Sequence, residues 1–139
     1  MPGQRSILIV DDEFGLAEML REMLRESGYA VTLAINGRLA LEILAEQPID
    51  LVLTDMMMPV MDGAELASAM RRHDRYRTTP IIMMTSLPAV GPWEGLVDAV
   101  LRKPFTPELL LDTMTRALGS PGRNGAGRRP DSSPAPTNT

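Results

Sequence analysis

The chain has 139 residues, of which 44% are hydrophobic and 23% charged, and this is the length and composition of one globular domain. It contains no cysteine, which excludes disulfides, thiolate chemistry and Cys-based metal sites. The net charge is −4, and −6 without the last 21 residues, so direct nucleic-acid binding through a basic surface is not expected. No apolar run is long enough to span a membrane and the N-terminus lacks a secretory signal, so we expect a cytoplasmic protein without membrane insertion.

Apolar runs and turn signals alternate along the chain up to about residue 118. The first run, SILIV, has the character of a buried strand, and the amphipathic segment after it ends at Gly28. Asp62 can cap a later helix, and Thr106 followed by Pro107 marks the start of the last one. In chain order, the sequence predicts strand 6–10, helix 13–28, strand 30–34, helix 36–47, strand 50–54, helix 64–73, strands 80–85 and 99–103, and helix 106–118.

Strands that alternate with helices predict an α/β fold around a parallel sheet. The strands of such a sheet are apolar throughout because helices cover both faces, and the predicted strands have this composition. We therefore expect one domain over residues 1–118. Residues 119–139 are rich in Gly, Pro and Ser and lack periodic apolar positions, so we predict a disordered tail.

One crossover departs from the alternating pattern. Pro88, Gly91, Pro92 and Gly95 fall between the fourth and fifth strands, where a helix is expected. Both residue types disfavour a helix interior. We therefore predict that this fourth helix is short or irregular.

Polar residues follow the predicted strands at their carboxyl ends, where an open α/β sheet binds its ligand. Asp11 and Asp12 follow the first strand, Asp55 the third and Thr85 the fourth, while Lys103 ends the fifth. Lys103 is the only lysine among 14 basic residues. The sequence therefore predicts carboxylates, a hydroxyl and an ammonium group gathered at one edge.

The carboxylates Asp11, Asp12 and Asp55 would repel one another unless a cation lies among them. With oxygen ligands only, Mg²⁺ fits best, because it binds few carboxylates together with water and phosphate. One of the two adjacent aspartates can instead serve only to cap the following helix. With a metal beside it and Lys103 opposite, Asp55 can attack a phosphorus atom and become an aspartyl phosphate.

Four motifs, VDDE, LTDMMMPVMDG, MMTS and RKPF, occur in an order and spacing that resemble the receiver domain of two-component response regulators, of the single-domain, chemotaxis type. The likeness covers about residues 6 to 118. It implies a flavodoxin-like, doubly wound five-stranded parallel sheet of order 2-1-3-4-5 with helices on both faces.

The resemblance also implies roles for individual residues. Asp55 corresponds to the phosphoacceptor, and Asp11 and Asp12 to the acidic pair that serves Mg²⁺. Met57 would add a backbone carbonyl ligand, and Thr85 corresponds to the switch hydroxyl. The remaining implications are Lys103 as the phosphate-pairing lysine, a cis Lys103–Pro104 bond, and Ser86 beside the switch hydroxyl.

The same likeness implies the partners and the type of activity. The phosphoryl donor would be a sensor histidine kinase or a histidine phosphotransfer protein, and the output an unidentified downstream protein. The chain would be a phosphoacceptor that catalyses its own phosphorylation and slow dephosphorylation, and not an enzyme acting on other substrates. No output domain follows residue 118, so the chain either signals by docking or is one part of a longer protein.

Two features depart from the family pattern. Val100 replaces the aromatic residue that usually lies three positions before the lysine, and the irregular crossover carries Trp93. We predict that a loop with Trp93, in place of a regular helix, moves on phosphorylation. Met57 and Leu87 are apolar where side chains orient an attacking water, so we predict slow self-dephosphorylation.

Other functions are less compatible with these residues. The methionines around Asp55 are more typical of core packing than of a Cu(I) site. A flavin phosphate would be repelled by Asp11 and Asp12, and an aspartyl phosphatase would need a second acid soon after Asp55. The main alternative is a receiver-like interaction module that works without phosphorylation.

Overall fold

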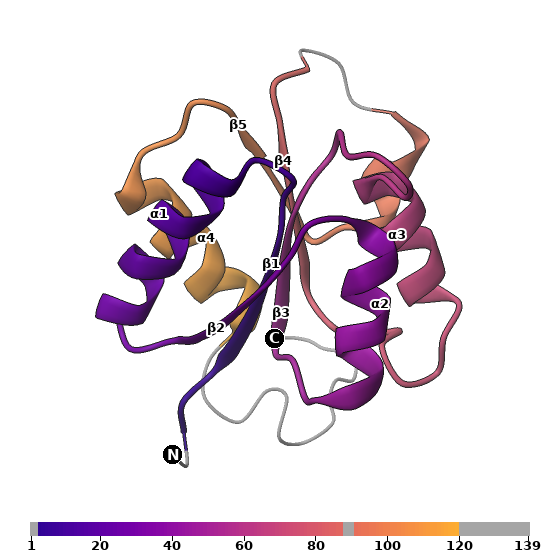
Figure 1. Cartoon of the computed structure of the whole chain (residues 1–139), viewed down its shortest axis with the longest axis horizontal. Coiled ribbons are helices and arrows are strands. Elements are labelled where there is room, and N and C mark those ends of the chain that lie inside the picture. The colour runs from indigo at the N-terminus through magenta and orange to yellow at the C-terminus, as the bar shows by residue number, and fades with distance from the viewer. Residues whose placement is uncertain (1–2, 88–90, 120–139) are drawn as a thin grey trace.

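The computed structural model describes residues 3–87 and 91–119. It is a three-layer α/β structure with a five-stranded parallel sheet of order β2-β1-β3-β4-β5, as predicted (Figure 1). The predicted tail, from residue 120 onward, and residues 88–90 of the crossover lie outside the described residues. The elements are β1 (Ser6–Val10), α1 (Phe14–Glu26), β2 (Ala30–Ala34), α2 (Gly37–Glu46), β3 (Leu51–Asp55), α3 (Gly63–Arg71), β4 (Ile81–Thr85), η1 (Pro92–Leu96), β5 (Ala99–Arg102) and α4 (Pro107–Leu118).

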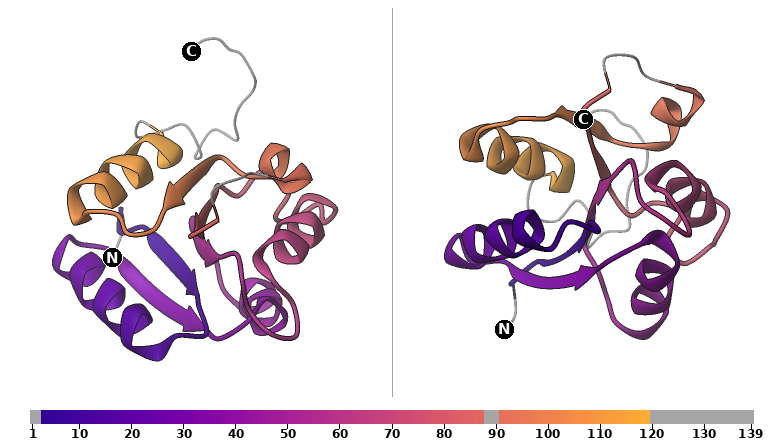
Figure 2. Two further views of the ribbon diagram at one scale, coloured as in Figure 1. Left: turned by 90° about the horizontal axis from the view of Figure 1, so that it is seen from above. Right: turned by 45° about the horizontal axis from the view of Figure 1, so that its top comes forward.

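The helices form one layer on each face of the sheet (Figure 2). Helices α1 and α4 cover one face, where Ile7 and Ile9 of β1 point, and α2 and α3 cover the other face, where Leu8 and Val10 point. All four of these side chains are fully buried. Alternate residues of one strand thus enter two separate cores, which explains why the strands are apolar without interruption.

Side-chain caps fix the start of three helices. Asn36, Asp62 and Thr106 each accept a hydrogen bond from the backbone three residues later. Asp62 and Glu65 form a reciprocal capping box at α3. The helix boundaries differ from the predicted ones by one or two residues, which is the usual uncertainty of helix ends.

In the described part of the crossover between β4 and β5, residues 86–87 and 91–98, the helical structure is limited to the 3₁₀ segment η1, in agreement with the prediction of a short or irregular fourth helix. Arg71, at the end of α3, holds this crossover with its guanidinium group. Its Nε donates to the Leu96 carbonyl at 2.8 Å, and its other nitrogens bond to the carbonyls of Arg77 and Thr79 and to the Asp98 carboxylate. One side chain therefore ties α3, the loop after it and the approach to β5 together.

Two aspartates join neighbouring strands at the amino end of the sheet. Asp50 accepts the Ser6 N–H at 2.7 Å and returns its own N–H to the Ser6 carbonyl at 2.8 Å. Asp98 does the same with Ile81, at 2.8 Å in both directions. These reciprocal pairs fix β1 against β3 and β4 against β5 at the end opposite to the acidic cluster.

Candidate functional site

The predicted site residues meet at the carboxyl edge of the sheet. Asp11 follows β1 directly, and Asp55 is the last residue of β3 and not the residue after it, as the predicted strand 50–54 implied. Carboxylate oxygens of Asp11, Asp12 and Asp55 lie within 4.8 Å of one another. Asp11 is 3% exposed and Asp55 8%, while Asp12 is exposed. The topology thus brings three carboxylates from two neighbouring strands into one cluster.

Lys103 supplies the positive charge of this cluster. Its Nζ lies 2.6 Å from Asp55 Oδ1 and 3.9 Å from Asp11 Oδ2. The Lys103 N–H donates to the Thr85 carbonyl at 2.9 Å, and the Lys103–Pro104 bond is cis, as predicted. The lysine is thereby held at the end of β5, one residue beyond the strand.

The pKa values of two of these groups depart from their usual range. Burial raises the pKa of the Asp11 carboxyl, and the neighbouring charge of Asp55 adds to the increase. Burial alone would lower the pKa of Lys103, but the hydrogen bond and charge of Asp55 outweigh it and leave that pKa raised. Lys103 is therefore a stable cation, and the cluster has more negative charge than this one cation offsets.

The donor set fits a hard divalent cation. Asp11 Oδ1 accepts the Glu13 N–H at 2.9 Å, but Asp11 Oδ2 is buried and no hydrogen bond reaches it within the described residues. Neither Asp11 nor Asp12 occupies the N-cap of α1, a position that Glu13 holds. A buried acceptor without a donor, beside two further carboxylates, is the arrangement that a bound Mg²⁺ would satisfy.

The loop from β3 to α3 packs closely against Asp55. A Cβ on Gly63 would come within 2.4 Å of the Asp55 carbonyl oxygen, so only glycine fits there. The Met61 N–H donates to the Pro59 carbonyl at 2.8 Å around Val60, whose φ is 71°. This is a γ-turn with positive φ, a strained conformation for a β-branched residue. Met57 lies in the same loop, and no hydrogen bond among the described residues uses its carbonyl.

Thr85 and Ser86 lie on the β4 side of the cluster. Thr85 is buried, and its Oγ1 accepts the Leu87 N–H at 3.0 Å. Ser86 is exposed and borders a cavity of about 710 Å³ between α1 and the chain after β5, together with Lys103 and Phe105. Of the two hydroxyl residues, only Ser86 therefore lines this cavity.

Val100 and Trp93 do not join this cluster. Val100 is half-buried on β5, and Trp93 is a buried residue of η1. Within the described residues, neither makes a hydrogen bond to the carboxylates or to Lys103. Their predicted part in switching and output stays a prediction.

A set of five exposed apolar side chains lies at the same end of the sheet as the acidic cluster and was not predicted. Its members follow the carboxyl ends of four strands, and Val60 is the most exposed at 72%. Apolar residues in loops just after strand ends were the available signal, but their composition alone did not show whether they were buried. This set, called the apolar set below, consists of Phe14, Ile35, Met57, Val60 and Leu87.

The five-stranded parallel sheet of order 2-1-3-4-5, with polar groups gathered at the carboxyl ends of its strands, places the chain among the flavodoxin-like, doubly wound α/β domains. The family model for the response regulator receiver domain matches residues 7–115, and the chain belongs to this family.

Relatives and solved structures agree with this assignment. The chain is 40% identical over 116 residues to the response regulator MprA of Mycolicibacterium vanbaalenii, covering 81% of this chain and 49% of that protein. It superposes on the chemotaxis response regulator CheY4 of Vibrio cholerae with a TM-score of 0.75 and 34% identity, over 82% of this chain and 98% of that one. The chain spans about half the length of the curated relatives it matches.

A second similar structure holds a metal. The receiver domain of the sensor histidine kinase PA1611 from Pseudomonas aeruginosa PAO1, solved with a magnesium ion coordinated in its active site cleft, is 31% identical to this chain. The TM-score is 0.77, and the match covers 85% of this chain and all of that one. None of the helices that the structure describes combines the length and the hydrophobicity that a bilayer crossing demands.

Proposed function

We propose that the chain is a phosphorylation-dependent switch of a two-component phosphorelay, with Asp55 as the phosphoacceptor. The observation that carries the proposal is the 2.6 Å pair between Lys103 Nζ and Asp55 Oδ1 inside a cluster of three carboxylates. A carboxylate that only stabilised the fold would not need two further acids beside it. Membership of the receiver family supports the same role.

The chemistry is a transfer of a phosphoryl group from a phosphohistidine to Asp55. An Asp55 carboxylate oxygen attacks the phosphorus, and the P–N bond breaks with its electron pair left on the imidazole. Lys103, already beside Asp55, pairs with the negative charge of the transferred group. The Thr85 hydroxyl gives up its bond with the Leu87 N–H and donates to a phosphoryl oxygen.

Asp11, Asp12, Asp55 and the Met57 carbonyl would hold Mg²⁺. When bound, the ion offsets negative charge on the phosphoryl oxygens and the carboxylates. Asp11 Oδ2, which is buried, accepts no hydrogen bond within the described residues and lies 3.9 Å from Lys103 Nζ, supports this assignment. The likeness to the magnesium-bound receiver domain from Pseudomonas aeruginosa points the same way.

The donor is a sensor histidine kinase or a histidine phosphotransfer protein, and the target is a further protein that reads the altered surface. The apolar set at the Asp55 end of the sheet favours a protein as donor, because exposed apolar side chains of this kind suit a protein contact. The net charge of −4 supports the absence of direct nucleic-acid binding. The whole system operates in the cytoplasm, and the chain catalyses only its own phosphorylation and dephosphorylation.

The test is intact-protein mass spectrometry after incubation with Mg²⁺ and a small phosphoryl donor. One added phosphoryl group is expected in the unchanged protein, and none in Asp55→Asn or in the presence of a chelator. Asp12→Asn is the matched variant within the cluster and should be labelled slowly. No added mass, under conditions that label another receiver domain in parallel, would contradict the proposal.

A second candidate function is a receiver-like interaction module that binds partners without phosphorylation. Two observations favour it: Val100 replaces the usual aromatic residue, and η1 replaces the fourth helix. The same mass measurement separates the two functions. A protein that binds Mg²⁺ without accepting a phosphoryl group would belong to this second class.

A further inference from the structure

The loop that joins α3 to β4 carries a dense group of positive charges. Its sequence from residue 71 is RRHDRYR, so four of the 14 basic residues of the chain fall within seven positions, with Asp74 as the only acid among them. Residues 1–118 together have a net charge of −6, so this loop locally reverses the charge of the domain. It precedes β4 and therefore lies at the amino end of the sheet, opposite to the acidic cluster (Figure 1).

Three arginines of this loop are exposed and have little negative charge to pair with. Arg72 and Arg75 form no ion pair within the described residues. Arg77 pairs with Asp74 at 3.5 Å, and that carboxylate is 98% exposed, so the pair is weak. Arg71 differs, because its 2.9 Å pair with Asp98 belongs to the fold. Residues 72–77, called the basic loop below, thus present three cations to the solvent.

His73 adds a further donor to the basic loop. Its Nδ1 accepts the Arg75 N–H at 3.1 Å, so the neutral ring carries its hydrogen on Nε2. The side chain is exposed, and its ring stacks on Tyr76 with the centroids 4.4 Å apart. Three guanidinium groups and one imidazole N–H therefore lie within six residues, a set of donors that suits carboxylate oxygens.

Contacts with the rest of the domain hold this loop in place. The N–H groups of His73, Tyr76 and Thr79 each donate to the carbonyl three residues earlier, at 3.1 Å. Tyr76 is 6% exposed and packs in the core beneath α2 and α3. Arg75 lies 5.8 Å from the centroid of the Tyr76 ring and donates to the Ala45 carbonyl of α2 at 3.1 Å. Donors that are already fixed lose less conformational entropy on binding than flexible ones.

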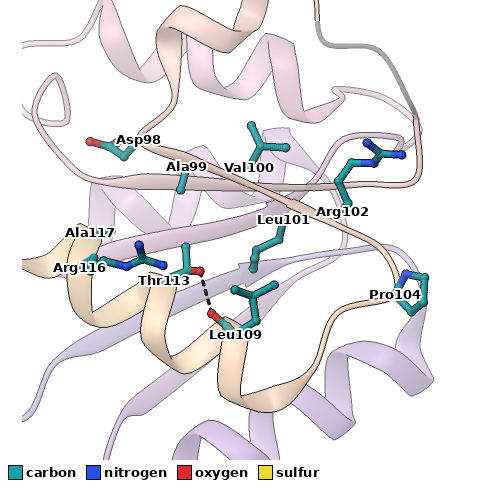
Figure 3. Close-up of a pocket in the computed structure, with 10 residues that line it drawn as sticks. All are labelled: Asp98, Ala99, Val100, Leu101, Arg102, Pro104, Leu109, Thr113, Arg116 and Ala117. Carbon is teal, nitrogen blue, oxygen red and sulfur yellow. Dashed lines mark hydrogen bonds between the residues drawn. The ribbon is translucent and has the colours of Figure 1, made fainter.

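Arginines elsewhere in residues 1–118 are scattered or paired. Arg102 and Arg116 project from opposite ends of a groove of about 810 Å³ between β5 and α4 (Figure 3). Arg116 pairs with Asp112 at 2.7 Å, and Arg21 pairs with Glu18 at 2.6 Å. No other seven-residue stretch of residues 1–118 that lies apart from this loop holds more than two basic residues. The basic loop is therefore a distinct charged patch.

We propose that the basic loop is a docking site for an acidic segment of a partner protein, one that presents several aspartate or glutamate side chains close together. Arg72, Arg75 and Arg77 pair with carboxylates of that segment, since a guanidinium group holds a carboxylate through two parallel N–H bonds. His73 adds one hydrogen bond. The site lies at the end of the sheet away from Asp55, so binding does not depend on phosphorylation.

The surroundings of the loop favour a protein over a nucleic acid or a membrane. A long polyanion that extended beyond the loop would meet the net negative charge of residues 1–118. Membrane-surface segments combine basic with apolar side chains, and none of the large exposed apolar side chains of the described residues lies in this loop. A short acidic segment pairs with the loop without reaching the acidic remainder of the domain.

The test is a titration of the ¹⁵N-labelled full chain with an oligoglutamate peptide, followed by amide NMR shifts at low ionic strength. We expect the shifts to concentrate in residues 71–79 and the affinity to fall as salt is added. A peptide of the same length, with serine in place of glutamate, is the control ligand and should cause no shifts there. Shifts that are absent, or that concentrate elsewhere in the molecule, would overturn the proposal.

Two variants with the same change in net charge separate a local site from general attraction. The loop variant carries glutamine at the three arginines of the basic loop and should bind about tenfold more weakly, since three ion pairs are lost. The control variant carries Arg25→Gln, Arg38→Gln and Arg102→Gln, at exposed arginines without an ion pair in the described part of the chain, and should lose less than about twofold. Equal losses in the two variants would overturn the proposal.

Arg77→Gln alone keeps the test decisive if the loop variant fails to fold. The Arg77 side chain is 63% exposed and pairs with Asp74 only weakly, so this variant should fold normally and lose part of the affinity. An unchanged affinity would contradict the proposal. A single-stranded oligonucleotide and phosphatidylserine vesicles, titrated in the same way, represent the other polyanions. Tighter binding of either one than of oligoglutamate would make the loop a nucleic-acid or membrane site and would also overturn the proposal.

Discussion

Asp11 is a buried acid whose Oδ2 accepts no hydrogen bond within the described residues, and this has a measurable effect on stability. Because its pKa is raised in the folded state, chiefly by burial, the folded state holds this proton to higher pH than the unfolded state. Its contribution to stability is thus fully present below the unfolded pKa of ~3.9 and is lost as pH rises through the folded pKa. At neutral pH and without Mg²⁺, the charged Asp11 destabilises the fold.

We therefore predict that Asp11→Asn raises the free energy of unfolding by about 1 kcal/mol at pH 7 in a chelator, at the low end of the cost of an unsatisfied buried group. The gain should disappear below about pH 4, where Asp11 of the unchanged chain is protonated. Thermal unfolding at pH 7 and below pH 4, monitored by circular dichroism, measures the gain and its disappearance. Asp12→Asn, at an exposed carboxylate, is the control and should gain less; a loss of stability in Asp11→Asn at pH 7 would contradict the argument.

Val60 holds a positive φ at the centre of a γ-turn, which a β-branched residue adopts only under strain. We predict that Val60→Asn stabilises the chain by about 1 kcal/mol, because asparagine tolerates the left-handed region. Urea unfolding measures the change. Val60→Ala is the matched variant: it removes the branch but keeps a Cβ at positive φ, so it should gain less than asparagine.

Met57 and Leu87 are exposed apolar residues beside the cluster, and neither can orient an attacking water. If Asp55 is the phosphoacceptor, its phosphoryl group should be lost slowly. Replacement of Met57 by Asn and of Leu87 by Glu should shorten the half-life several-fold, as followed by intact mass over time. Isosteric apolar changes, such as Leu87→Met, should leave the half-life as it is; equal half-lives for polar and apolar variants would refute this prediction.

At the scale of elements, one side chain, Arg71, bonds the end of η1 to α3 and to the loop after α3. Burial lowers the pKa of the Arg71 guanidinium, although Asp98 opposes the shift. The group remains charged at any physiological pH. Its planar shape lets it reach three carbonyls and a carboxylate at once, which a lysine ammonium on a flexible stem cannot do.

We predict that Arg71→Lys lowers the free energy of unfolding by about 2 kcal/mol, since charge-assisted hydrogen bonds contribute about 1.5–3 kcal/mol each and lysine keeps only some of them. Amide exchange should accelerate locally in residues 91–98. Arg72→Lys, at the neighbouring exposed arginine that contacts Ser68, should change little. Uniform acceleration along the chain would mean that Arg71 stabilises the whole fold without holding η1 in particular.

At the scale of the whole molecule, folding brings together, from β1, β3 and the loop after β3, the groups that we propose to hold Mg²⁺. An ion that binds only the folded state stabilises it by ~2.7 kcal/mol at a hundredfold excess over its dissociation constant. We predict that Mg²⁺ raises the melting temperature and that a chelator reverses the effect. Asp11→Asn and Asp55→Asn should each reduce the Mg²⁺ response; an unchanged response in both would place the ion elsewhere.

The fold and most of the cluster could be predicted from the sequence for physical reasons. Strands such as Ile7–Val10 are apolar on both faces, which only a sheet between two helix layers requires, and parallel strands bring Asp11, Asp55 and Lys103 to one edge. Contacts between segments that lie far apart in the chain produce no comparable pattern in the sequence. The four-way bonding of Arg71 and the exposure of Val60 depend on how elements pack, and neither periodicity nor composition encodes that.

The reciprocal hydrogen bonds of Asp50 with Ser6 and of Asp98 with Ile81 hold the amino end of the sheet differently from its carboxyl end. At the amino end, hydrogen bonds from aspartate side chains join neighbouring strands in addition to the main-chain hydrogen bonds of the sheet. At the carboxyl end, the loops carry a strained turn, an excess of negative charge and exposed methionine. We therefore expect a change in charge at Asp55 to displace the loops at the carboxyl end of the sheet, and to leave the hydrogen-bonded strands at the amino end in place.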